Sequence, residues 1–509
     1  MMKRIAIVLS VVVGCIANHG ASAADVSATA GPAPETLPAN VKLIRIEALP
    51  KKIELSHPYD YAQLLLTAVA GGGERFDVTR LATVATEDGL VTVNDRRLMR
   101  PQSDGQGVLH CEILGQSLDV PVVVTGKKDP HPVSFIREVQ PAMSKLGCNQ
   151  GTCHGAAQGK NGFKLSLRGY DPLFDHTALT DDLAGRRFNR AAPDQSLMLL
   201  KPCGGVPHVG GVLTKPGEPY YEMFRAWISQ GVKLDIDSPR VVKIEVLPKN
   251  PQVALPGMKQ QIVVMAHYSD DSVRDVTAEA FVESSSTETV VVDKQGLATA
   301  ERRGEAAMLA RYEGSYDATT MIVMGDRSGF AWKDAPENNH VDTLVYKKLK
   351  KVKILPSDLC TDAEFVRRVY LDLVGLPPDA DEVRAFLADD RPTRQKRDEL
   401  IDRLVGSPEY VEQWTNKWAD LLQVNRKFLG EQGAWAMRNW IRQAISTNMP
   451  YDQFVHDVLT AQGSTLDNPP ASYYKVLRAP GETMENTTQL FLAVRFNCNK
   501  CHDHPFERW

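Results

Sequence analysis

The chain of 509 residues is too long for a single hydrophobic core, so its length predicts three or four domains. Hydrophobic residues make up 43% and charged residues 24% of it, which is ordinary for globular protein. The formal net charge of −4 gives no reason to expect nucleic acid or an anionic membrane as a partner, and neither is predicted.

The first 23 residues have the features of a secretory signal. Lys3 and Arg4 make a short positive start, residues 5–16 are apolar, and residues 21–23 are small. This order predicts export with cleavage after residue 23. The apolar run is too short to span a bilayer, and no later stretch is apolar enough to anchor the chain, so no membrane span is predicted.

A lipoprotein signal is the alternative reading of the same segment. Residues 12–15 read Val-Val-Gly-Cys, which looks like a lipobox, and cleavage there would leave Cys15 as a lipidated N-terminus. Both readings predict an exported chain, in the periplasm or at the cell surface.

Two stretches of alternating apolar and polar residues predict two antiparallel β-sandwiches. Residues 24–40 are rich in Ala, Pro and Thr and predict a disordered leader. Short period-two runs with Gly and Asp-Gly breaks then predict a sandwich over residues 41–126. A second copy covers residues 240–326, where residues 241–248 match 43–50 and the Asp-Val-Thr at 275–277 matches 77–79.

These two stretches resemble the bacterial Ig-like group 2 modules. The resemblance rests on the leading strand, the Asp-Val-Thr, a strand near residues 289–292 and the Gly-Leu-Ala-Thr-Ala at 296–300. It implies adhesion or spacing and no catalysis. A polysaccharide or a protein at the cell surface is the partner that it implies.

A cysteine and histidine motif lies between the two sandwiches, in residues 131–238. Cys148 and Cys153 are followed at once by His154, and two thiols with an adjacent imidazole are the groups that hold haem covalently and ligate its iron. Four residues separate the cysteines where two are usual, so the loop must bulge. An apolar helical face over residues 135–146 leads into the motif, and an amphipathic helix over 219–231 follows it, as in a small cytochrome c.

A sixth iron ligand is expected shortly before the last helix. His208 is the candidate, with Met198 and Met223 as weaker ones. The structural alternative is that His208 is a surface histidine. Arg168 and Lys164 could pair with haem propionates, or they could be solvated side chains.

The motif and its surroundings resemble the cytochrome-type domain of large secreted planctomycete proteins. The similar stretches are residues 146–156 and the Gly-Lys-Asn-Gly-Phe-Lys-Leu-Ser-Leu-Arg-Gly-Tyr-Asp-Pro at 159–172. Proteins of that family also carry Ig-like modules and a helical domain of unknown function. The resemblance implies haem c and export, makes the wide cysteine spacing a family trait, and names no substrate.

The remainder, residues 339–509, predicts an all-α domain. Thr361 and Glu364 form a capping box, Ser407 and Pro408 begin a second helix, and the aromatic residues that follow fit a core. This region resembles the helical domain of the same family, which normally continues into another domain. The resemblance therefore implies that the chain is truncated at its C-terminus.

A second, regularly spaced motif ends the helical domain. Cys498, Cys501 and His502 have the spacing of haem attachment, with His502 as the iron ligand. A Cys498–Cys501 disulfide and a zinc site that uses His502 and His504 are the alternatives.

The sequence thus predicts a multidomain protein in which Ig-like sandwiches flank an all-α cytochrome c-like domain, followed by an all-α helical domain. The predicted function is haem binding and electron transfer with one haem c, or two, and a redox partner that the sequence does not name. A cell-surface interaction or adhesion protein with structural cysteines, Cys148 bridged to Cys153, is the alternative. A haem oxidase or peroxidase with an open iron site is the second alternative, and no catalytic residue is predicted.

Overall fold

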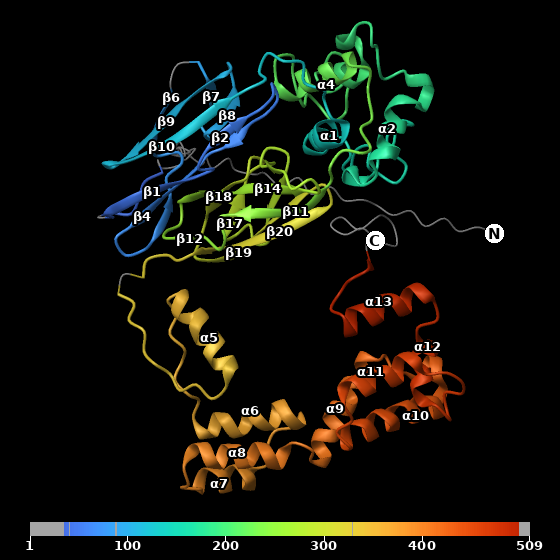
Figure 1. The fold of residues 1–509 in the computed structure, drawn as a ribbon. Coiled ribbons are helices and arrows are strands. Elements are labelled where there is room, and N and C mark those ends of the chain that lie inside the picture. The colour runs from blue at the N-terminus through green and yellow to red at the C-terminus, as the bar shows by residue number, and fades with distance from the viewer. Residues whose placement is uncertain (1–34, 40, 87–88, 328, 498–509) are drawn as a thin grey trace, which may run out of the picture.

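The computed structural model describes residues 35–39, 41–86, 89–327 and 329–497 (Figure 1). The first sandwich module contains ten short strands in three sheets, ordered β1-β4-β5, β2-β10-β9-β6 and β3-β8-β7. Their bounds are β1 Leu43–Leu49, β2 Ile53–Leu55, β3 Ala62–Gln63, β4 Leu65–Ala70, β5 Arg75–Asp77, β6 Thr83–Thr86, β7 Val91–Val93, β8 Leu98–Pro101, β9 Gly105–Ile113 and β10 Gln116–Val124.

Alternating burial explains the strands. In β10, Val120, Val122 and Val124 are buried, whereas the residues between them face outward or are half-buried. The pairs are antiparallel as predicted, except that the short β2 runs parallel to β10.

The second sandwich module repeats this order strand for strand. Its sheets are β11-β14-β15, β12-β20-β19-β16 and β13-β18-β17. Even the irregularity is shared, because the register shifts between Leu43 and Arg45 in β1 and between Val241 and Lys243 in β11. The bounds are β11 Val241–Leu247, β12 Gln252–Val253, β13 Lys259–Gln261, β14 Val263–Tyr268, β15 Val273–Asp275, β16 Phe281–Ser284, β17 Val290–Val292, β18 Leu297–Ala300, β19 Gly304–Tyr312 and β20 Ser315–Val323.

The middle segment, residues 131–238, is built from short helices and long loops. The predicted helix at 135–146 is present as a π-helical turn, η1 Phe135–Val139, continued by α1 Gln140–Lys145, and Pro141 lies in the first turn of α1. The other elements are η2 Leu167–Gly169, α2 Pro172–Thr180, η3 Asp182–Gly185, η4 Pro193–Gln195, α3 Leu197–Leu200 and α4 Pro219–Ser229. Trp227 of α4 is fully buried, stacks on Phe135 at 5.2 Å between ring centroids, and donates from Nε1 to the Lys233 carbonyl at 2.9 Å.

The helical region follows the second module and occupies the lower part of Figure 1. The capping box predicted at Thr361 begins α6, and Gly375, at φ 72°, ends it in the left-handed conformation. The bounds are α5 His340–Lys351, α6 Asp362–Val374, α7 Ala380–Ala388, α8 Thr393–Leu404, α9 Pro408–Leu421, α10 Arg426–Ser446, α11 Tyr451–Thr460, η5 Pro469–Ala471, α12 Ser472–Val476 and α13 Pro480–Phe491. Within the described residues, none of the helices combines the length and the apolar character that crossing a membrane requires.

The hydrophobic cores show which parts belong together. One cluster of buried side chains runs through both sandwich modules, whereas the middle segment has a cluster of its own. The helical region has two further clusters, one around α6 and α8 and one around α10, α11 and α12. The predicted order, β-sandwiches followed by a helical C-terminal region, is confirmed.

Candidate functional site

The loop that carries the first cysteine and histidine motif closes on itself through backbone hydrogen bonds. The His154 N–H donates to the Cys148 carbonyl at 3.0 Å, and the Cys153 N–H donates to the Gln150 carbonyl at 2.9 Å. Asn149 is buried, and its Nδ2 donates to Ser144 Oγ at 2.7 Å. The extra residues between the cysteines are therefore taken up by hydrogen-bonded turns, which is the bulge that the spacing predicts.

The side chains of this motif face different surroundings. Cys148 packs against the core of the middle segment, and burial raises the pKa of its thiol to about 12. His154 is half-buried, with Nδ1 3.1 Å from the Phe163 carbonyl oxygen and its ring 4.5 Å from the Phe163 ring centroid. Burial lowers the pKa of His154, and the nearby His208 lowers it further. Cys148 and Cys153 are both free thiols.

The three candidates for the sixth iron ligand lie in different surroundings in the structure. His208 lies in a surface loop beside the fully exposed Val209, and its Nδ1 is 3.1 Å from the Gly211 carbonyl oxygen. Met223 of α4 is buried in the hydrophobic core of the middle segment, whereas Met198 is half-buried against that core. Lys164 lies over the Phe174 ring, and the Arg168 N–H donates to the Asn149 carbonyl. Cys498, Cys501, His502 and His504 lie outside the described residues, as do the signal segment and Cys15.

Gly155 makes the compact form of this loop feasible. A Cβ on Gly155 would lie 2.0 Å from the Asn149 carbonyl oxygen, and this backbone atom cannot yield as a flexible side chain can. We expect Gly155→Ala to lower the free energy of unfolding of the middle segment by about 1–3 kcal/mol, the usual cost of overpacking. Denaturant unfolding followed by Trp227 fluorescence, with the other tryptophans replaced by phenylalanine, measures it.

Gly162→Ala is the matched control in the same loop, because a Cβ there meets no atom within 4 Å, although its φ of 73° adds backbone strain. A Gly155→Ala variant that is no less stable than Gly162→Ala would contradict the tight packing.

A polar site lies between the two sandwich modules, and the sequence did not point to it. Asp77 ends β5 in the first module, and its Oδ2 accepts from the Gln261 N–H of the second module at 2.5 Å. Asp275 ends β15 in the second module, and its Oδ2 accepts from the Gln63 N–H of the first at 2.6 Å. The aspartate of each module thus accepts from the backbone of the equivalent glutamine in the other module.

The groups around each aspartate repeat as well. Asp77 Oδ1 accepts from the Thr79 N–H at 2.8 Å, and Asp275 Oδ1 accepts from the Thr277 N–H at 2.9 Å. The side chain of Gln63 donates to the Arg96 carbonyl, as that of Gln261 donates to the Gln295 carbonyl.

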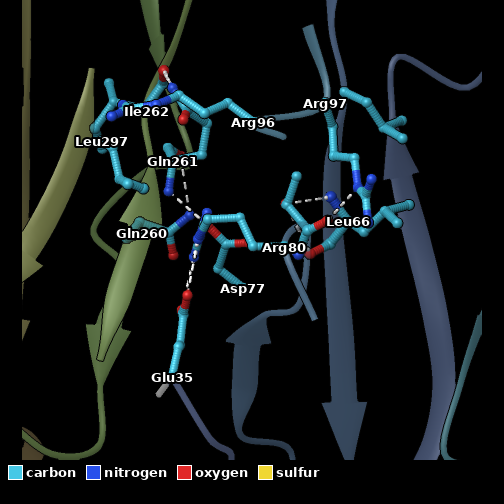
Figure 2. A network of polar contacts seen from close by, with 12 residues as sticks. Glu35, Leu66, Asp77, Arg80, Arg96, Arg97, Gln260, Gln261, Ile262 and Leu297 are labelled. Carbon is cyan, nitrogen blue, oxygen red and sulfur yellow. Dashed lines mark hydrogen bonds and ion pairs between the residues drawn. The ribbon is translucent and has the colours of Figure 1, made fainter. Parts of the chain in front are cut away.

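The two halves of this network differ in charge. Figure 2 shows Asp77 and Arg80 beside Gln260 and Gln261, with Glu35 completing the chain of contacts. Arg80 pairs with Glu35 at 2.7 Å and with Asp77 at 3.2 Å. Asp275 has Ala278 where Asp77 has Arg80, and burial raises its pKa to about 6.

The middle segment packs against the second module through further buried polar contacts. Arg274 donates to the Arg137 carbonyl at 2.7 Å, and Lys145 donates to the Ala280 carbonyl at 2.6 Å. Arg137 lies over the Tyr268 ring at 4.2 Å from its centroid. Burial lowers the pKa of Lys145 to about 8. The two modules and the middle segment, which together we call the block, therefore share one continuous set of interfaces.

The repeat itself was the signal that could have led to this site. The matched Asp-Val-Thr at residues 77–79 and 275–277 indicates more than a sandwich, because Asp77 is buried and Asp275 is half-buried, and a carboxylate withdrawn from water requires donors. Those donors are backbone N–H groups of the other module, which have no signature in the sequence.

Comparison with known proteins gives one family match. A family model described as "PSCyt2: Protein of unknown function (DUF1549)" matches residues 340–509. A search of curated proteins finds no match.

Comparison with solved structures gives low similarity. Domains 5-6 of the S-layer protein SbsC are 10% identical, with a TM-score of 0.23, over 56% of this chain and 99% of that chain. Domains 4-9 of the same protein give 10% identity and a TM-score of 0.23 over 56% of this chain and 32% of that one. Extracellular domains 3-5 of Drosophila OTK give 7% identity and a TM-score of 0.12 over 55% and 61%.

These findings correct the main functional prediction. The structures named are surface-layer and extracellular proteins, and the matched family has no known function. The prediction of a c-type cytochrome that binds haem and transfers electrons is therefore wrong. Nor do the matches support a cytochrome c-like domain in the middle segment.

The haem prediction rested on a short motif, and the fold of the loop that carries this motif is explained by contacts within the loop itself. The loop folds through its own hydrogen bonds, with Gly155 allowing the close approach to Asn149. The separate ligand assignments to Cys148, Cys153, His154 and His208 stay predictions that no comparison tests.

Proposed function

We propose that this chain is an exported interaction protein of the cell surface, in which the block presents a fixed surface to a protein or polysaccharide partner. The observation that carries the proposal is that Asp77 and Asp275 each accept a hydrogen bond from a backbone N–H of the other sandwich module. The signal-like N-terminus supports export.

Rigidity is the property that this interface supplies. Domains of one chain usually meet through modest polar interfaces that permit relative motion. Here the two modules share a single apolar cluster, and the carboxylates between them, one buried and one half-buried, are hydrogen-bonded. A surface held in one arrangement loses less conformational entropy on binding, so more of the contact energy appears as affinity.

The proposal does not include the Cys148–Cys153 disulfide expected for a protein with structural cysteines. Both thiols are free, and the loop that joins them is closed by the hydrogen bonds described above. Within the block, hydrogen bonds and apolar packing therefore take the place of a covalent bridge.

Binding to isolated envelopes of the producing cells tests the proposal. The purified mature chain is mixed with envelopes and sedimented, and saturable binding is expected. Trypsin-treated envelopes and polysaccharide extracted from them separate the two kinds of partner, because treatment abolishes binding to a protein and spares binding to a polysaccharide.

The role of rigidity is tested in the same assay. Double replacement of Asp77 and Asp275 by alanine is expected to weaken sedimentation, whereas Arg384→Ala, on the exposed face of α7, is not. Absence of saturable binding to any envelope preparation would contradict the proposal, as would a Soret band in the purified chain.

A further inference from the structure

Three side chains with metal-ligating atoms converge where the first sandwich module meets the middle segment. His57 lies in the turn after β2, His131 lies just before η1, and Glu138 lies within η1. Their ligand atoms all lie within 4.8 Å of one another. The two imidazoles come from different parts of the block, so only the tertiary structure brings them together.

The geometry of this cluster is compact. The two histidine rings stack at 3.9 Å between centroids with 8° between their planes. His131 Nε2 is 3.0 Å from each carboxylate oxygen of Glu138, and His57 Nδ1 is 3.9 Å from Glu138 Oε1. A cation placed among these side chains would bind His131 and Glu138 separately, and these two bonds would replace their direct contact with each other.

Burial leaves one ligand atom without a partner. His57 Nδ1 is shielded from solvent and makes no hydrogen bond among the described residues. A buried nitrogen of this kind costs stability unless something binds it. The Glu138 side chain is only 7% exposed, and the Ser134 N–H donates to its Oε2 at 2.8 Å, which fixes the carboxylate as outer partners of metal ligands do.

The surrounding charges do not oppose a cation. Asp60, in the same turn as His57, adds a second carboxylate, and its negative charge acts on the His57 ring. Arg274 also acts on this site, but Glu279 lies 3.6 Å from its guanidinium and balances its charge.

We propose that His57, His131 and Glu138 form a Zn²⁺ site that clamps the first sandwich module to the middle segment. Two imidazoles and one carboxylate are a three-ligand set that zinc uses with a water in its fourth position. The site goes beyond the proposed function and does not depend on it, because it concerns the assembly of the block and not its partner.

Zinc content and cobalt spectra of the full mature chain test the site. The chain is stripped with a chelator, reloaded with Zn²⁺, and its metal content measured by mass spectrometry. His57→Asn and Glu138→Gln are each expected to lose one equivalent, with at least about 100-fold weaker binding at that site. His110→Asn is the control, because His110 belongs to the same module but is exposed and pairs with Asp119 on the neighbouring strand.

Co²⁺ distinguishes this site from metal held by the cysteine motifs. Bound Co²⁺ is expected to show visible d–d bands without a thiolate charge-transfer band, since all three ligands are nitrogen or oxygen. This measurement needs no variant and therefore holds even where a substitution impairs folding. The proposal would be overturned if both variants kept the zinc content and affinity of the parent chain, or if His110→Asn lost as much zinc as they do. It would also be overturned if bound Co²⁺ gave only spectra of the thiolate type.

Discussion

Replacing Asp77 by alanine is expected to lower the free energy of unfolding of the block by about 3–5 kcal/mol. The Asp77 side chain is fully buried, and its loss leaves the N–H groups of Thr79 and Gln261 without acceptors. Arg80 keeps only Glu35 as its ion pair. Hydrogen exchange of β4 and β14, followed by mass spectrometry, reports the stability of each module separately.

Arg96→Ala is the matched control for this variant. Arg96 pairs with Asp293 across the same interface, but both side chains are 35% exposed, so the expected cost is no more than about 1 kcal/mol. Because Asp77 binds both modules, its loss should speed exchange in β4 and in β14 alike. Equal costs for the two variants, or a change confined to β4, would contradict the view that Asp77 joins the modules.

Replacing Glu313 by glutamine is expected to stabilise the chain by about 1–3 kcal/mol at pH 8 and to leave it unchanged below pH 4.5. Glu313 lies at the turn between β19 and β20, and both its carboxylate oxygens are shielded from solvent. Burial raises the pKa of Glu313 from 4.5 to about 7, although the charges of Arg240, Arg274 and Arg137 lower it.

The sign follows from proton binding. Because the folded chain holds this proton more tightly than the unfolded chain, stability falls as pH rises from about 4.5 to about 7 and then levels off. Glutamine carries no charge, so the fall caused by Glu313 should vanish. Calorimetric melting at a series of pH values measures it.

Glu288→Gln is the control for Glu313→Gln, since Glu288 is an exposed partner of Arg302 on the same module. It should leave the slope of stability against pH unchanged. Asp275 and Asp175, each with a pKa raised to about 6 by burial, add a similar slope in both variants and the parent chain. Parallel curves for Glu313→Gln and the parent would contradict the assignment.

Local signals in the sequence predicted elements well, because short-range physics controls them. The capping box at Thr361 predicted the start of α6, since the cap and its partner lie within one helical turn. Proline is compatible with the first turn of a helix, and Pro141 lies there in α1. Alternation of apolar residues likewise predicted the strands of both modules.

The functional prediction from the same sequence was wrong because a short motif can have more than one physical cause. Cys148, Cys153 and His154 match the residues that hold haem, yet their loop is closed by its own hydrogen bonds and by the glycine at 155. A motif predicts chemistry only when its surroundings agree with it.

The sequence by itself determined the two sandwich modules, the helical nature of the C-terminal region and the starts of α6 and α9, because each depends on residues close together in the chain. The tertiary structure alone decided that Asp77 meets Gln261, that Asp275 meets Gln63 and that His57 meets His131. These contacts join segments far apart in sequence, and several use backbone N–H groups that every residue except proline carries. No residue pattern records them, and only the folded chain brings each carboxylate to its donor.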